Sequence, residues 1–138
     1  MIQCILVGYN HSAGARHAFE HALAVARRTR AHVVAVAVVP VPKTLLAADV
    51  DYSIERARER FVAIFEQLAA RAREVGVRLT TELVAGYAAE QILLLAYQYQ
   101  ADLIVLGGLR GNPIRRWICG SVTRQVARRA RCQTLLVH

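Results

Sequence analysis

Hydrophobic and polar positions divide the chain into two kinds of segment that alternate. Short apolar runs without a helical period predict buried strands, and they cover residues 2–7, 32–39, 103–106 and 134–137. Residues 77–84 alternate in part between apolar and polar and predict a further strand. Between them, apolar residues recur at spacings of three and four, which predicts amphipathic helices. Ser12 is a good N-cap for the first helix, and the others cover 53–75, 88–100 and 121–130. Residues 44–52 are expected to form a surface connection.

The regular alternation of strand and helix predicts an α/β fold. Parallel strands need crossover connections, so the helices must cover both faces of a parallel sheet. We expect a single three-layer α/β/α domain over the 138 residues, with a five-stranded parallel sheet and four main helices. Ligands of such sheets bind outside the carboxyl ends of the strands, where the strand order reverses. Two strand ends carry suitable chemistry, the turn at 8–12 and the glycine loop at 107–111.

The stretch around the fourth predicted strand is the part of the chain most suited to hold an anion. The strand is followed by Gly107, Gly108 and Gly111, and Gly120 and Ser121 are expected to begin the last helix. Glycine lets a backbone come close to a phosphate, and the first free N–H groups of a helix point at it. The order of strand, glycine loop and helix start therefore predicts an anion-binding corner.

Composition bears on the compartment. Hydrophobic residues make up 55% of the chain, and no apolar run approaches the length that crosses a membrane. The first residues enter a strand directly, without the basic region or cleavage site of an export signal. Cys4, Cys119 and Cys132 are odd in number and form no CxxC pair, which favours reduced thiols. These observations predict a cytoplasmic protein that does not contact a membrane.

The formal charge of +8 indicates anionic partners. Asp102 is the last acidic residue, and seven arginines follow it, so much of the excess lies beside the glycine loop. The last helix is basic through Arg124, Arg128, Arg129 and Arg131. Because no aromatic residues are interleaved with these arginines, nucleic acid is disfavoured as a partner.

Two enzyme patterns carry little weight in this chain. His17 and His21 fit HxxEH, whose two histidines share one helix face as zinc ligands do. They lie on the polar face of a covering helix, and no further acidic ligand suggests itself, so no metal is expected. None of the serines lies in a GxSxG turn, which argues against a hydrolase nucleophile.

Two segments and one spacing resemble the universal stress protein family along nearly the whole chain. ILVGYNHS at 5–12 resembles the opening strand of that family and its VDxS turn. LVAGYAAEQILLLAYQYQADLIVLG at 83–107 resembles its third strand, the following helix and the fourth strand. The nucleotide signature of the family is glycine, two residues, glycine, nine residues, then glycine and serine or threonine. From Gly107 to Gly120 and Ser121 this chain keeps the full span.

The resemblance implies a sheet of order 3-2-1-4-5 and a homodimer joined through the last strand, residues 134–137. For the nucleotide-binding branch of the family it also implies ATP, with AMP and ADP as alternatives and with or without Mg²⁺. By position, Gly8 and Asn10 would lie near the base and sugar and Val39 near the base, while the glycine loop would hold the phosphates. The implied nucleotide-binding residues are Gly8, Asn10, Ser12, Val39, Leu106, Gly107, Gly108, Arg110, Gly111, Gly120, Ser121 and Val122.

Two positions depart from the family pattern. Asn10 stands in place of an aspartate, so one acceptor oxygen remains and the charge is lost. Arg110 stands where the signature has its middle glycine. Either Gly111 takes over with a small shift of the loop, or Arg110 covers the anion pocket, where it could pair with phosphate or fill the site.

The preferred hypothesis is a cytoplasmic, homodimeric protein that binds adenine nucleotide and acts in stress response or signalling. The alternative is a nucleotide-free interaction module in which Arg110 blocks the pocket. A third hypothesis, a slow ATPase or autophosphorylating enzyme, is disfavoured because the sequence places no general base near the loop. No catalytic residue is therefore assigned.

Overall fold

The computed structural model describes residues 1–41, 47–108 and 113–138, and at 47, 48 and 113–119 it describes the backbone alone. The strands are β1 (Cys4–Gly8), β2 (His32–Pro40), β3 (Leu79–Gly86), β4 (Leu103–Gly107) and β5 (Gln133–Val137). The helices of the described residues are α1 (Ala13–Thr29), α2 (Ala47–Glu74), α3 (Ala88–Gln98) and α4 (Pro113–Arg129). No helix in these ranges is long and apolar enough to span a membrane.

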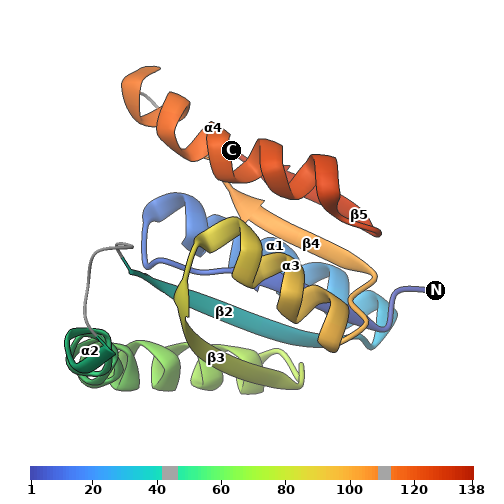
Figure 1. Cartoon of the computed structure of the whole chain (residues 1–138). Helices are drawn as coiled ribbons and strands as arrows, with labels where there is room; N and C mark the ends of the chain where they lie inside the picture. The colour runs from blue at the N-terminus through green and yellow to red at the C-terminus, as the bar shows by residue number, and fades with distance from the viewer. Residues whose placement is uncertain (42–46, 109–112) are drawn as a thin grey trace.

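The five strands form one parallel sheet of order β3-β2-β1-β4-β5. This confirms the predicted α/β architecture, its strand order and its four helices. The order reverses between β1 and β4, because the chain first builds the sheet outward through β2 and β3 and then returns to the other side of β1 (Figure 1). The carboxyl ends of β1 and β4 therefore lie side by side at the switch point.

Two apolar layers hold the helices on the sheet, with α1 and α2 on one face and α3 and α4 on the other (Figure 1). Alternate residues of β1 enter opposite layers, since Ile5 and Val7 pack with α1 and α2 while Leu6 packs with α3 and α4. All three side chains are fully buried. Burial of each contributes roughly 1.5–3 kcal/mol, which explains why both central strands are short and apolar throughout.

Most element ends agree with the sequence prediction within two residues, but the starts of two helices were wrong. Helix α2 begins at Ala47, six residues before the predicted start, so most of the expected surface connection is helical. Asp49 stabilises the first turn of α2, because a negative charge interacts favourably with the positive end of the helix dipole. Arg56 stabilises the same region of α2 by contacts with Tyr52, four residues earlier. It donates a hydrogen bond to the Tyr52 hydroxyl at 3.3 Å and lies 5.8 Å from the Tyr52 ring centroid.

Helix α4 begins at Pro113, eight residues before the predicted start. Proline is favoured at the first position of a helix, and no residue from Ile114 to Cys119 breaks one. Gly120 and Ser121 therefore lie in the helix interior, where each backbone N–H donates a hydrogen bond to the carbonyl one turn earlier. The expectation that these two residues supply the first free N–H groups of the helix was wrong.

Candidate functional site

A crevice of about 260 Å³ opens at the carboxyl edge of the sheet, at the switch point between β1 and β4. Its floor is formed by the strand ends of β1, β2 and β4, and its walls by the starts of α1 and α3 and the middle of α4. The described lining residues are Gly8, Tyr9, Asn10, Ala15, Val36, Val38, Pro40, Ala88, Ile92, Leu106, Gly107, Val122 and Thr123. The sequence predicted this position from the topology of a doubly wound sheet.

The β1–α1 turn is held by the side chains of Asn10 and Ser12. Asn10 Oδ1 accepts from the Ser12 hydroxyl at 2.6 Å and from the Ser12 backbone N–H at 3.2 Å. The same hydroxyl accepts from the Ala15 N–H at 3.1 Å, which makes Ser12 the N-cap of α1 as predicted. Asn10 thus forms an Asx turn at the mouth of the crevice, a role that an aspartate oxygen performs equally well.

Tyr9 is a buried part of the crevice wall that the sequence analysis did not identify. Its backbone N–H donates to the Val36 carbonyl at 2.7 Å, and its hydroxyl lies 3.3 Å from His11 Nδ1. Its ring meets Phe19 edge-on at 6.1 Å between centroids. Burial raises the pKa of the Tyr9 hydroxyl, against a smaller lowering by Arg16, so the ring is neutral at physiological pH. Tyr9 therefore fixes the wall and supplies no charge.

Two glycines allow α1 to start directly against the end of β4. A Cβ on Gly107 would lie 2.3 Å from the backbone of Gly14, and a Cβ on Gly14 would lie 2.2 Å from the carbonyl oxygen of Gly108. Neither backbone can accommodate such an approach, so packing alone requires glycine at 14 and 107. Gly107 keeps the turn before α1 pressed against β4, which brings both predicted loops into one site.

Gly120 differs from these two glycines, because packing against the described residues does not require it. An added Cβ would meet no described atom within 4 Å. A glycine inside a helix costs about 1 kcal/mol relative to alanine. Thr123 follows Gly120 by three residues on the same face of α4 and lines the crevice together with Val122. Gly120 therefore leaves open space one turn away from the crevice wall.

Some of the implied binding residues line the crevice and others do not. The crevice is lined by five of them, and Ser12 joins the site through Asn10. Val39 is buried but does not line the crevice, since its neighbours Val38 and Pro40 occupy that face of β2. The Ser121 hydroxyl accepts from Gln125 Nε2 at 3.2 Å and belongs to a separate hollow on α4. The five lining residues are Gly8, Asn10, Leu106, Gly107 and Val122.

Three remaining positions lie at the glycine loop. The Gly108 N–H donates to the Val137 carbonyl at 2.7 Å, which attaches the end of β4 to β5. Arg110 and Gly111 lie outside the described residues, so the two alternatives for Arg110 stay predictions.

Several wall residues were missed by the sequence analysis for a shared reason. Val36, Val38 and Pro40 lie on one face of β2 at a spacing of two, and Ala88 and Ile92 face them from α3. The spacing was visible in the sequence, but a strand that is buried on both faces gives no polar signal to mark the face that meets a ligand. Thr123 gave no signal apart from its closeness to Gly120.

The chemistry of the crevice is that of a binding slot. Its described walls are mainly aliphatic, with Tyr9, Asn10 and Thr123 as the side chains that carry polar groups, and none of its described lining residues is acidic. Within the described ranges, no group of three or more metal-ligating side chains is assembled. Glu20, the acidic residue of the HxxEH match, accepts from Arg71 of α2 at 2.8 Å. The geometry favours an uncharged planar or aliphatic group in the slot, with polar atoms at its mouth.

Sequence comparison identifies the family of the chain. The model described as the universal stress protein family matches residues 1–138. A universal stress protein of Methanocaldococcus jannaschii is 32% identical over 123 residues, which cover 87% of this chain and 72% of that protein. The region that the family model matches includes both loops of the crevice.

Structural comparison agrees with the sequence matches. Universal stress protein UspA from Lactobacillus plantarum superposes with a TM-score of 0.81 at 27% identity, covering 99% of this chain and 98% of that one. A universal stress protein whose crystal structure was determined in complex with cAMP superposes with a TM-score of 0.75, also at 27% identity, covering 99% and 97% of the two chains. The chain belongs to the universal stress protein family.

Proposed function

We propose that the protein binds an adenine nucleotide in the crevice between β1 and β4. The observation that carries the proposal is an aliphatic slot at the strand switch point with the Asn10 turn at its mouth. A family member of known structure was crystallised with cAMP, which supports an adenine nucleotide as the ligand class. ATP, with or without Mg²⁺, is the nucleotide that the family resemblance implies.

The size and lining of the slot support the following placement of the parts of the nucleotide. A volume of about 260 Å³ is small for a ligand pocket, so the nucleoside fills the slot and the phosphates extend beyond it. The base packs between Val38 of β2 and Ile92 of α3, and the sugar lies against Gly8 and the Asn10 amide. The phosphates then run from Gly107 toward α4, where Gly120 leaves space for a close approach.

A second candidate function is a nucleotide-free interaction module. The observation that favours it is the continuous helix from Pro113. In it the N–H groups of Gly120 and Ser121 donate hydrogen bonds to carbonyls of α4 itself. Binding of phosphates by those N–H groups requires the first turns of α4 to unwind. In this alternative α4 keeps its full length and Arg110 blocks the pocket.

Isothermal titration with AMP and ATP, the latter with and without Mg²⁺, separates the two candidates. We expect saturable binding that Val38→Phe weakens by about tenfold or more, because the larger ring occupies the place of the base. Val62→Phe on α2, where the side chain is 54% exposed, is the matched control and should bind like the unaltered protein. No binding of any nucleotide at millimolar concentration would reject the proposal and favour the second candidate.

We also propose that two copies associate through β5, which forms one edge of the sheet and pairs with β4 alone. Leu135 on this strand is 36% exposed, and Gln133 is also exposed. An unpaired strand edge with an exposed apolar side chain is a template for a second copy. The proposal matches the homodimer that the family resemblance implies.

A further inference from the structure

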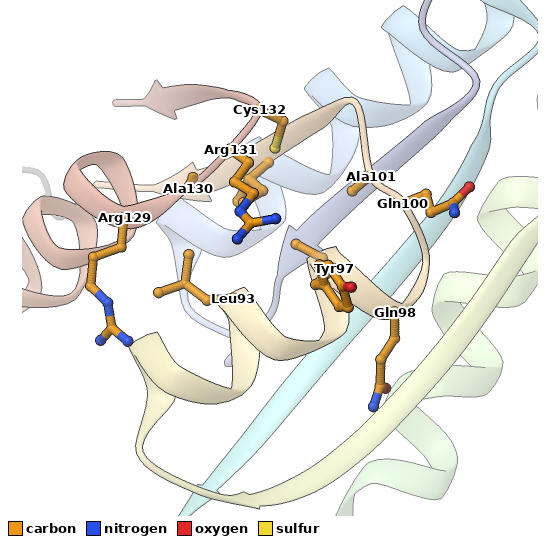
Figure 2. Close-up of a pocket in the computed structure, with 11 residues that line it drawn as sticks. Leu93, Tyr97, Gln98, Gln100, Ala101, Arg129, Ala130, Arg131 and Cys132 are labelled. Carbon is orange, nitrogen blue, oxygen red and sulfur yellow. The ribbon is translucent and has the colours of Figure 1, made fainter.

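Two adjoining hollows lie at the amino edge of the sheet, at the opposite ends of the strands from the crevice. The first, of about 500 Å³, lies between the last turn of α3 and the α4–β5 connection (Figure 2). The second, of about 710 Å³, lies beside the end of α1 and the start of β3. Gln100 lines both, so the two hollows form one continuous surface. We refer to them as the α3–α4 hollow and the α1–β3 hollow.

The α3–α4 hollow combines an exposed aromatic ring with arginines. Tyr97 on α3 is 69% exposed, and the Arg131 guanidinium carbon lies 5.8 Å from its ring centroid. Figure 2 shows Arg131 reaching from the α4–β5 connection toward Tyr97, with Arg129 extending along the other side of the hollow. Leu93 and Cys132 back the hollow with apolar surface. Cations beside an aromatic face in an open hollow suit an anionic ligand that carries a planar group.

The α1–β3 hollow continues the same chemistry. Arg28 and Arg30 reach it from the end of α1, and Arg78 reaches it from the residue before β3. Tyr99 forms part of its lining, and its hydroxyl donates to Glu82 at 2.5 Å. The three arginines come from segments about fifty residues apart in sequence, which the parallel topology brings to one edge.

The arginines of this edge form no ion pair among the side chains that the structure describes. The ion pairs formed among residues 1–41, 49–108 and 120–138 use Arg58 and Arg71, and none involves an arginine of either hollow. The carboxylate of Asp102 accepts hydrogen bonds from the backbone N–H groups of Gln3 and Cys4, at 2.7 Å and 3.0 Å. The nearby carboxylates thus bind their own chain, and the arginines stay available to an external anion.

Two polar residues on this edge hold a backbone conformation that normally selects glycine. Arg30 follows α1 at φ 59° and Gln100 follows α3 at φ 54°. Glycine is the usual residue at such a left-handed position after a helix. At both positions the chain carries a long polar side chain that lines a hollow. Strained backbone of this kind concentrates at functional sites.

We propose that the two hollows bind single-stranded nucleic acid, with the arginines on its phosphates and Tyr97 stacked on an unpaired base. An exposed ring inside a hollow suits a base that is free to unstack, whereas a duplex hides its base faces. The amides of Gln98 and Gln100 supply donors and acceptors for base edges. The sequence argued against nucleic acid because the arginines of α4 lack interleaved aromatics, but the fold supplies the aromatic ring from α3.

Fluorescence anisotropy with a short labelled single-stranded RNA and the matching DNA tests the proposal. We expect binding that weakens strongly between about 50 mM and about 200 mM salt, with a slope reduced by about 0.7 for each phosphate contact removed. Arg131→Ala should lower both the affinity and that slope. Tyr97→Leu should lower the affinity by about fivefold or more and leave the slope unchanged, because stacking releases no counterions.

Controls separate this surface from diffuse charge and from the crevice. Arg60→Ala removes an exposed arginine of α2 that lies in neither hollow and should leave the affinity unchanged. AMP at a concentration that just saturates the crevice should not displace the strand, since the crevice lies at the other edge of the sheet. The proposal is overturned by absence of binding at low salt, by equal losses in Arg60→Ala and Arg131→Ala, or by an intact affinity in Tyr97→Leu. Displacement by AMP would also overturn it by moving the strand to the crevice.

Discussion

At the scale of single residues, the glycines fall into two groups, those required by packing and one that is better explained by ligand binding. Gly14 and Gly107 are required because α1 and β4 touch backbone to backbone. Against the residues that the structure describes, Gly120 has no such requirement, and it weakens the helix that contains it. A residue that costs stability without a packing reason is best explained by close approach of a ligand.

The variant Gly120→Ala should therefore raise the stability of the protein and lower its affinity for nucleotide. We expect the free energy of unfolding to rise by about 0.5–1 kcal/mol, since alanine removes the helix penalty and its Cβ meets no described atom. Nucleotide affinity should fall in the same variant. Chemical denaturation and titration calorimetry measure the two effects. Ala127→Gly, at an exposed position of the same helix, should lower stability by a similar amount and leave affinity unchanged.

At the scale of elements, the sequence predicted every strand and helix, because the fold is built from runs with clear periods. The starts of α2 and α4 escaped prediction for a physical reason. Several residues in each region can begin a helix, and Ser121 was as good a signal as Pro113. Neighbouring structure decides between such signals, and a single sequence does not contain it.

The candidate site was predictable to the same degree. The topology fixed its position between β1 and β4, and Asn10 and Ser12 were identified from turn chemistry. Tyr9 and Thr123 were missed because their exposure to the crevice depends on how α1 and α4 pack. The amino-edge hollows were missed as well, since Tyr97 and Arg131 meet only after the chain has folded.

Asp102 joins two elements through hydrogen bonds that depend on its charge. Its carboxylate accepts from the N–H groups of Gln3 and Cys4, and these bonds lower the pKa of Asp102. A carboxyl whose folded pKa is lowered contributes stability above its unfolded pKa of about 3.9, and that stability is lost as the pH falls further. We expect Asp102→Asn to be less stable at pH 7, by on the order of 0.5 kcal/mol because the group is exposed. Denaturation should show a constant difference from about pH 7 to about pH 5, which closes as the pH falls below the unfolded pKa.

At the scale of the whole molecule, the two edges of the sheet carry different chemistry. The carboxyl edge holds an aliphatic slot, and the amino edge holds an arginine-rich surface whose nearest carboxylates are occupied. The lateral edge at β5 is a third surface, and it is separate from both. The proposed nucleotide, polyanion and dimer contacts are therefore assigned to different places on one domain.

The proposed β5 interface makes a simple prediction about association. Leu135→Arg places a charge on the exposed edge strand, where two copies would bring like charges together. We expect this variant to be monomeric by sedimentation velocity at a concentration where the unaltered chain is dimeric. Leu94→Arg changes a leucine on α3 that is more exposed, at 48% against 36% for Leu135, and should remain dimeric. A dimer that persists in Leu135→Arg would place the interface elsewhere.

The most direct test of nucleotide binding follows the backbone amide signals of the labelled protein by NMR during a titration with AMP. We expect the largest shifts at Gly8, Asn10 and Thr123, around the crevice, with saturation at one nucleotide per chain. Shifts confined to Gln100 and Arg131 would place the nucleotide at the amino edge instead. Unchanged spectra at millimolar AMP, or shifts at that other edge, would contradict the central claim.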